Sequence, residues 1–185
     1  MSDLAWETLD SETDYDCPGF SVTREEVRYP DGSEGEFHYV DEPPSVVVIP
    51  RPPEGAVVVI EEWRQAVGRV NLGFPAGGVE SGDDDLAAAA HRELREETGY
   101  VADEVEHLAA AEPANGITDA VHHYFVGRDC IATGDRDLDA DESIRVETTT
   151  LDYLRERLRA GDLRDGRTAL GVFYYDALRD GSDAD

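Results

Sequence analysis

The sequence predicts a mixed α/β domain preceded by a small antiparallel β region. Two short runs, Ser45 to Ile49 and Ala56 to Trp63, are almost continuous Val and Ile, as in strands of a sheet that is covered on both faces. A helix rich in Leu and Ala follows them at about 85–98, and two amphipathic helices are predicted near the end of the chain. A chain of 185 residues is long enough for one domain with a full core.

The N-terminal region reads as a hairpin. Ser21 to Tyr29 alternates as a strand does, Pro30 to Gly35 is rich in turn residues, and Glu36 to Val40 returns as the partner strand. Asp41-Glu42-Pro43-Pro44 then breaks the chain. We therefore expect a β hairpin region over 1–44, a main domain over 45–180 and an acidic tail over 181–185.

Strands are predicted after the first helix at Glu104 to Ala110, Val121 to Arg128 and Ile144 to Thr150. Two helices then follow. The first has Leu at helical spacing and ends at Gly161, and the second runs from Thr168 to Leu178.

The most informative feature is the run Arg92 to Gly99, which places three carboxylates on one turn of the first helix. Glu93, Glu96 and Glu97 have the spacing i, i+3 and i+4, so they share a face and repel one another. Helical phase puts them on the continuation of the apolar stripe that faces the sheet. Acidic residues in a last turn also oppose the helix dipole. Two local rules are broken at one place, which indicates a functional site.

An all-carboxylate cluster suits a hard cation such as Mg²⁺ or Mn²⁺, whereas zinc normally brings His or Cys ligands. The alternative is a solvated helix that happens to be rich in Glu and Arg. In so acidic a chain, the placement of the carboxylates carries the argument, and their number does not.

Together with the glycine-rich stretch before it, this run resembles the signature of the Nudix hydrolase family, Gly-x5-Glu-x7-Arg-Glu-apolar-x-Glu-Glu-x-Gly-apolar. Counting from Gly78 gives the family spacing without a gap and puts Asp84 at the first Glu. A second register starts at Gly77, uses Asp83 and has one extra residue before Arg92. The sequence leaves both registers open.

The resemblance implies roles for the matched residues. Glu93 and Glu97, helped by Glu96, would hold the metal ions, and Arg92 would orient these carboxylates. A backbone carbonyl just before the signature glycine, here Gly77, or Ala76 in the other register, would complete a metal shell. The family fold would be an α/β/α sandwich with a mixed sheet.

Segments outside the signature bear on the substrate. Glu61 to Arg69 and Phe74 to Gly77 are similar to segments of ADP-ribose and nucleotide-sugar pyrophosphatases, although Gly73 stands where those proteins usually have Glu. The stretch Glu112 to Asp119 is similar to their Ser-Pro-Gly loop. By this resemblance, Arg64, Pro113 and Gly116 would bind substrate, and Arg64 would contact a phosphate or the terminal ribose.

The implied reaction is the Mg²⁺-dependent hydrolysis of ADP-ribose, or of a related nucleoside diphosphate sugar, to a nucleoside monophosphate and a sugar phosphate. In ADP-ribose hydrolases the general base often precedes a late strand in a Glu-x-Ile-x-Val context. Glu142-Ser143-Ile144-Arg145-Val146 matches that context, so Glu142 is the expected base and Asp141 the second choice. Alternatives are another nucleotide substrate (a dinucleoside polyphosphate, NADH or an oxidised dNTP) and a sensor of nucleotide sugars without hydrolytic activity.

The composition is strongly acidic. The net charge is −27, and all 16 basic residues are Arg. Such a surface resembles that of haloarchaeal proteins, in which concentrated salt screens the self-repulsion. It argues against nucleic acid as a partner, since that needs a basic face. Two distant cysteines indicate no disulfide framework, and no apolar run resembles a signal peptide or a membrane span. We expect a cytoplasmic protein and, because the N-terminal hairpin resembles a dimerisation element in placement, a homodimer.

Overall fold

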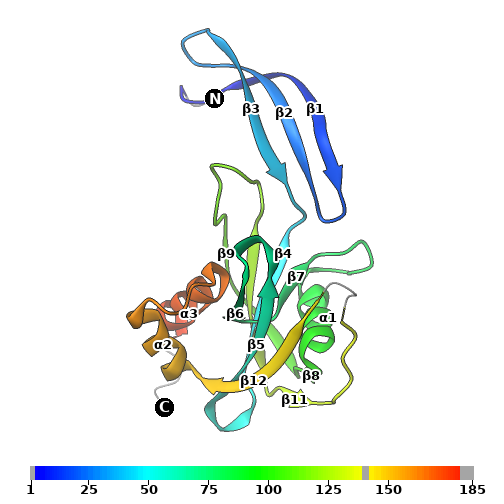
Figure 1. Ribbon diagram of the computed structural model, residues 1–185, viewed down its shortest axis with the longest axis vertical. Coiled ribbons are helices and arrows are strands. Elements are labelled where there is room, and N and C mark those ends of the chain that lie inside the picture. Colours follow the sequence, from blue (N-terminus) through cyan, green and yellow to red (C-terminus); the bar gives the residue numbers. More distant parts are fainter. Residues whose placement is uncertain (1–2, 139–141, 180–185) are drawn as a thin grey trace. The chain divides into compact units, whose positions relative to one another are not determined.

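The computed structural model describes residues 3–138 and 142–179, so Asp141 and the expected tail at 181–185 lie outside the described residues. The chain forms two compact units (Figure 1). The first contains the residues up to Pro44 together with Glu112–Val121, and the second contains Ser45–Ala111 and the chain from His122 onward. The segment Glu112–Val121 therefore groups with the N-terminal region and not with the strands that flank it in sequence.

The first unit is a three-stranded antiparallel sheet in the order β1-β2-β3, formed by β1 (Glu7–Cys17), β2 (Phe20–Arg28) and β3 (Glu34–Asp41). The predicted hairpin is β2 and β3, but β1 was not predicted. Its sequence is almost entirely polar and exposed, so it lacks the apolar alternation that marks a strand. Its backbone pairs with β2 from Glu7 to Cys17, and ion pairs add to this: Arg28 lies 2.6 Å from Glu7 on β1 and 2.9 Å from Glu34 on β3.

The second unit contains the remaining strands and all three helices of the described chain. Its four-stranded sheet has the order β7-β4-β10-β9, in which β4 and β10 are parallel and the other pairs antiparallel. A three-stranded antiparallel sheet has the order β12-β5-β6, and β11 pairs with β8. The bounds are β4 Ser45–Pro50, β5 Ala56–Arg64, β6 Arg69–Gly73, β7 Ala76–Gly78, β8 Tyr100–Val101, β9 Glu104–Ala111, β10 His122–Arg128, β11 Ile131–Ala132, β12 Ile144–Thr150, α1 Leu86–Thr98, α2 Leu151–Ala160 and α3 Gly166–Arg179, with short 3-10 turns at Pro53–Gly55 and Gln65–Val67.

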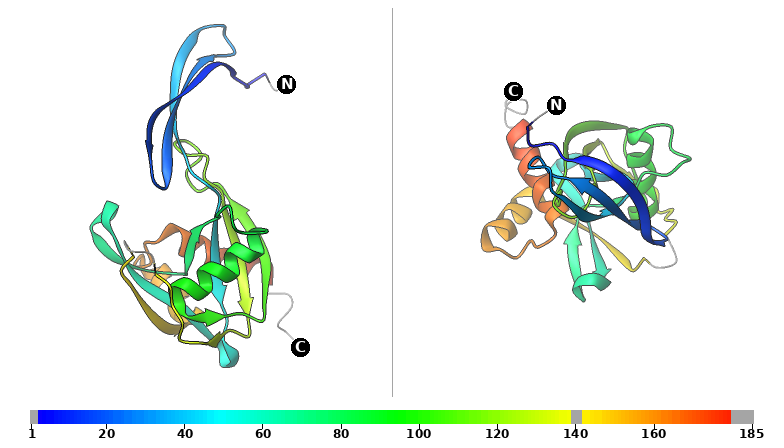
Figure 2. Two further views of the ribbon diagram at one scale, coloured as in Figure 1. Left: turned by 90° about the vertical axis from the view of Figure 1, so that its right-hand side faces the viewer. Right: turned by 90° about the horizontal axis from the view of Figure 1, so that it is seen from above.

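Helices cover both faces of this unit, as the Val and Ile runs predicted (Figures 1 and 2). Val46 and Val48 of β4 pack with Leu94 of α1 on one side, and their neighbours Val47 and Ile49 pack on the other. That second core also contains Leu154 of α2 and Val172 of α3. Successive residues of a strand point to opposite faces, so one buried strand serves two cores. The predicted α/β/α sandwich with a mixed sheet and an N-terminal antiparallel extension is confirmed.

Both ends of α1 have identifiable capping residues. The Asp85 carboxylate accepts a hydrogen bond from the backbone N–H of Ala88 at 2.8 Å, and Gly99 ends the helix at a φ of 70°. These ends fix the rotational phase of the helix, and with it the direction in which its glutamates point.

Candidate active site

The two glutamates at the inward phase of α1 are buried, as the sequence predicted. Glu93 is 8% exposed and Glu97 only 2%, whereas Glu96, one residue earlier than Glu97, is half-buried. On a solvated acidic helix face, Glu93 and Glu97 would be exposed. The alternative of a plain surface helix therefore does not describe this turn.

The strand β7 lies directly against these carboxylates. Ala76 donates its backbone N–H to Glu97 Oε2 at 2.9 Å. Gly77 faces Glu93 so closely that a Cβ added at position 77 would overlap the Glu93 carboxylate. A side chain at position 77 would displace the Glu93 carboxylate, so glycine allows this close approach of backbone and side chain.

Burial makes the negative charge of both groups costly. It raises the pKa of Glu97 to about 9 and that of Glu93 to about 7, although the hydrogen bond from Arg92 opposes the rise at Glu93. Two adjacent carboxylates in this state favour either protons or a cation. Pairs of buried groups with strongly shifted pKa values are typical of functional sites.

Arg92 connects the carboxylate cluster to the loop before α1. Its guanidinium donates to Asp83 through Nε at 3.0 Å and through Nη2 at 2.9 Å. Its Nη1 donates to Glu93 at 2.8 Å and to Glu96 at 3.2 Å, and its Nη2 also donates to the Gly78 carbonyl at 2.8 Å. A planar fork suits such a set of acceptors. Hydrogen bonding, chiefly to Asp83, raises the pKa of Arg92 further.

These contacts distinguish the two registers of the signature geometrically. The acidic partner of Arg92 is Asp83, whose side chain is only 6% exposed, whereas Asp84 is exposed. The spacing from Gly78 matched the signature without a gap, yet the structure pairs Arg92 with the acid of the Gly77 register. The extra residue is accommodated in the loop, where Asp83 also accepts from the backbone N–H of Glu80 at 2.8 Å.

Glu142 lies two residues before β12, which begins at Ile144. Ile144 pairs with Glu62 of β5, and Trp63 donates its N–H to the Ser143 carbonyl at 3.4 Å, so the same register continues toward Glu142. The charge of Glu142 is also among the causes that raise the pKa values of Glu93 and Glu97, after burial. The structure therefore brings Glu142 within electrostatic range of both buried carboxylates.

Arg64 lies beside a second polar group that sequence reasoning did not find. Its Nη2 is 2.6 Å from Oε2 of the buried Glu62. Burial lowers the pKa of Arg64, and the charge of Arg167 lowers it further, while Glu97 is among the charges that raise it. These two arginines, Glu62 and Asp165 line a small depression together with Asn71 of β6. Arg167 and Asp165 come from the start of α3, far along the chain, and no local pattern links them to Arg64.

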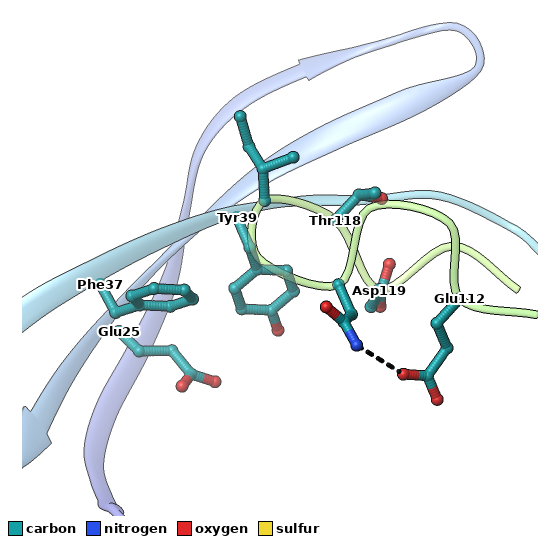
Figure 3. Close-up of a pocket in the computed structure, with 8 residues that line it drawn as sticks. Glu25, Phe37, Tyr39, Glu112, Thr118 and Asp119 are labelled. Carbon is teal, nitrogen blue, oxygen red and sulfur yellow. Dashed lines mark hydrogen bonds between the residues drawn. The ribbon is translucent and has the colours of Figure 1, made fainter. Parts of the chain in front are cut away.

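Pro113 and Gly116 lie in the first unit, with the N-terminal sheet. Their loop is tied to β3, since Val40 donates its N–H to the Ile117 carbonyl at 2.8 Å and its carbonyl accepts from Asp119. Beside the loop is an open pocket of about 420 Å³ (Figure 3). It is lined by Glu25, Phe37, Tyr39, Glu112, Asn115, Ile117, Thr118 and Asp119.

The chemistry of the donors in the second unit suits a hard divalent ion, because Glu93, Glu96 and Glu97 offer only carboxylate oxygens. Within residues 3–138 and 142–179 there is no group of three or more acidic, His or Cys side chains already arranged around one point. Arg92 holds Glu93 and Glu96, which accounts for part of this. Mg²⁺ is commonly bound through one or two carboxylates plus water and substrate phosphate, so the two buried carboxylates fit such an ion.

Fold and site together define a class of protein, an α/β/α sandwich with a carboxylate-bearing helix packed on a glycine-rich strand. The NUDIX domain family matches residues 41–165. The chain belongs to the Nudix family and is a Nudix hydrolase, similar to ADP-ribose pyrophosphatases.

The chain is similar over nearly its whole length to known proteins. It is 27% identical to an ADP-ribose pyrophosphatase of Bacillus subtilis (strain 168) over 175 residues, which cover 94% of each chain. It is 30% identical to a methanol dehydrogenase activator of Bacillus methanolicus over 154 residues, 81% of each. A crystal structure of an ADP compounds hydrolase superposes with a TM-score of 0.84 at 20% identity and covers 99% of each chain. No helix in the described part of the chain is both long and apolar enough to span a membrane.

Proposed function

We propose that the protein hydrolyses the diphosphate linkage of ADP-ribose, or of a related nucleoside diphosphate sugar, to a nucleoside monophosphate and a sugar phosphate in a reaction that depends on Mg²⁺ or Mn²⁺. Two relatives that bear the name ADP-ribose pyrophosphatase support this substrate class, one of them over 94% of this chain.

One observation carries the proposal. Glu93 and Glu97 are buried side by side against the backbone of Ala76 and Gly77, and Glu142 approaches them from β12. A buried pair of carboxylates is unfavourable unless a cation or a proton neutralises it. Binding of divalent ions and a diphosphate at this place would explain why the chain tolerates that cost.

Glu93 and Glu97, with Glu96, would hold the divalent ions, which supply an activated water and neutralise charge on the diphosphate oxygens. Glu142 accepts the proton of the attacking water as its oxygen bonds to phosphorus. The bond from that phosphorus to the bridging oxygen breaks, and the bridging oxygen leaves with the other phosphate. Arg92 keeps Glu93 and Glu96 oriented, and its bonds to Asp83 hold the helix to the loop.

The experiment is a product assay with Mg²⁺ in high salt. The substrates are ADP-ribose, ADP-glucose, GDP-mannose, NADH, dinucleoside polyphosphates and 8-oxo-dGTP. Release of AMP and ribose 5-phosphate from ADP-ribose is expected to be fastest. Rapid turnover of another substrate with no AMP from ADP-ribose would refute the substrate class and leave the hydrolase intact.

Variants test the roles of the residues. Glu97→Gln and Glu142→Gln are expected to lower kcat by about 100-fold or more, because general base and metal contacts each contribute on that order. Glu156→Gln is a matched control, an exposed glutamate on α2. Full activity of the Glu97→Gln protein on every substrate would show that the metal site is wrongly placed. Loss of activity on addition of EDTA, with recovery in Mg²⁺, tests the metal itself.

A sensor without hydrolytic activity is the second candidate. No carboxylate of the signature helix is missing, which favours an enzyme. Binding of ADP-ribose with no release of products in any metal would favour the sensor. Pro113→Ala and Gly116→Ala test the proposed substrate contacts of the loop, for which a raised KM at unchanged kcat is expected.

We also propose that the protein is a homodimer that uses its N-terminal sheet. Trp6, Tyr15 and Phe20 are exposed on this sheet region, and exposed aromatic residues are enriched in interfaces. Light scattering after gel filtration in high salt, compared with a protein that lacks the first 44 residues, would test this. A monomeric mass for the full chain at micromolar concentration would refute it.

A further inference from the structure

The depression beside Arg64 combines residues from three elements of the second unit. Glu62 and Arg64 lie at the end of β5, Asn71 on β6, and Asp165 and Arg167 at the start of α3. The cross-strand register pairs Glu62 with Asn71, so their side chains share a face of the sheet. None of these residues belongs to the signature.

The start of α3 is firmly attached at this place. Asp165 Oδ1 accepts hydrogen bonds from the backbone N–H groups of Arg167 and Thr168 at 2.9 and 3.2 Å, which makes it the cap of the helix. The hydroxyl of the buried Thr168 accepts from the Phe74 N–H at 2.9 Å. A Cβ at Gly73 would lie 3.1 Å from Thr168 Oγ1 and 3.3 Å from Asp165 Oδ2, so the absence of a side chain at Gly73 allows this approach.

In this group of four charged residues, the two carboxylates are less exposed to solvent than the two guanidiniums. The side chains of Glu62 and Asp165 are 10% and 9% exposed, compared with 34% for Arg64 and 25% for Arg167. Each acid holds the arginine of its own element, at 2.6 Å for Glu62 and Arg64 and at 3.9 Å for Asp165 and Arg167. The shielded acids thus hold two like charges at one depression, and the guanidiniums remain more exposed than the acids.

Most donors of these two guanidiniums have no acceptor among the described residues. Arg167 has only its long ion pair with Asp165 and no side-chain hydrogen bond within residues 3–138 and 142–179. By contrast Arg155, which is equally shielded at 26% exposure, donates to both Asp176 and Asp152. A purely structural arginine donates its N–H groups to acceptors within the fold, as Arg155 does. Arg167 does not do so among the described residues.

We propose that Arg167 joins Arg64, whose contact with substrate the family resemblance already implies, in binding the phosphate on the sugar side of the diphosphate, with Asp165 and Glu62 as positioning residues. Two forks that offer several N–H donors match the oxygens of a phosphate, which bidentate arginine contacts bind strongly. The carboxylates of α1 lie close to this site, because Phe74 donates its backbone N–H to Thr168 of α3 at 2.9 Å while Ala76, two residues further on, donates its own to Glu97 at 2.9 Å. In a chain of net charge −27, a phosphate needs such a local pair of cations. The assignment to the sugar side rests on the proposed function, whereas the binding of phosphate does not.

The first test is direct binding without turnover. Calorimetry in EDTA and high salt measures the affinity for ribose 5-phosphate, inorganic phosphate and ribose. Arg167→Ala is expected to weaken ribose 5-phosphate and phosphate by about 10- to 100-fold, the range for a lost hydrogen bond to a charged group. Arg164→Ala is the matched control, an exposed arginine three residues earlier. Unchanged phosphate binding by Arg167→Ala, or an equal loss in Arg164→Ala, would overturn the proposal.

Two further variants separate binding from folding. Asp165→Asn keeps an oxygen for the helix cap but removes the charge that positions Arg167, so KM should rise several-fold while the melting temperature stays near that of the wild type. Arg167→Lys keeps the charge without the fork and should recover only part of the affinity. A complete recovery by Lys would contradict the bidentate geometry. If the wild type hydrolyses no ADP-ribose, the proposed function fails, but phosphate binding still decides whether the two arginines form this site.

Discussion

Replacing Arg92 by Ala should destabilise the protein far more than any surface arginine does. Arg92 is 18% exposed in its side chain and donates five hydrogen bonds, to Asp83, Glu93, Glu96 and the Gly78 carbonyl. Its removal leaves two shielded carboxylates without their cation. Breaking a buried ion pair in this way costs ~3–5 kcal/mol, a large part of the ~5–15 kcal/mol that holds a domain folded.

Arg95→Ala is the matched control on the same helix. Arg95 is 52% exposed and contacts Glu96 alone, at 3.0 Å, and an exposed pair of this kind contributes ~0–1 kcal/mol. Both free energies of unfolding are measured by urea titration in EDTA, at about 0.1 and 1 M NaCl. At 1 M NaCl the small loss of unfolding free energy in Arg95→Ala should disappear. Most of the larger loss in Arg92→Ala should remain, because salt screens buried ion pairs less. A loss below ~1 kcal/mol for Arg92→Ala would refute this reasoning.

Three further predictions follow from individual contacts and from charge. Gly77→Ala places a Cβ in the Glu93 carboxylate and should lower activity about 100-fold with little change in circular dichroism, whereas Gly82→Ala, which has open space, should be fully active. At pH 8, iodoacetamide should label Cys17 and spare Cys130 until the protein unfolds, since Cys130 is buried and burial raises its pKa to about 11; equal labelling rates would contradict this. The melting temperature should rise between 0.1 and 1 M NaCl, because a net charge of −27 repels itself less as the Debye length falls from about 10 to 3 Å; a flat or falling temperature would count against it.

The sequence predicts the buried framework of the second unit well. β4, β5 and α1 were found within a residue or two of their ends, because a run of Val and Ile or a capped Leu/Ala stripe has few alternative structures. β1 was not found, since it pairs with β2 through its backbone and carries ion pairs but has no apolar alternation. β7 was not found either, as three small residues at Ala76–Gly78 read as a turn.

Some residues of the candidate site could likewise be predicted from the sequence, and others could not. The inward phase of Glu93 and Glu97 follows from spacing along one helix, so the sequence could predict it. The acidic partner of Arg92 could not be decided by counting, because the loop before α1 can absorb one extra residue and still bring Asp83 to the guanidinium. Asp165 and Arg167 reach the site only through the packing of α3 on Phe74, which is a tertiary contact with no local signal.

In a chain this acidic, half-buried arginines identify functional positions better than acids do. Asp and Glu make up 43 of the 185 residues, so their presence alone says little, but a shielded arginine must be accounted for by its acceptors. Arg24 and Arg155 bridge neighbouring strands or helices and use their donors within the fold. Arg92 uses its donors to hold Glu93 and Glu96 of α1. Arg167 alone of these four keeps most of its donors without an acceptor among the described residues, and that excess of donors is what an incoming phosphate would satisfy.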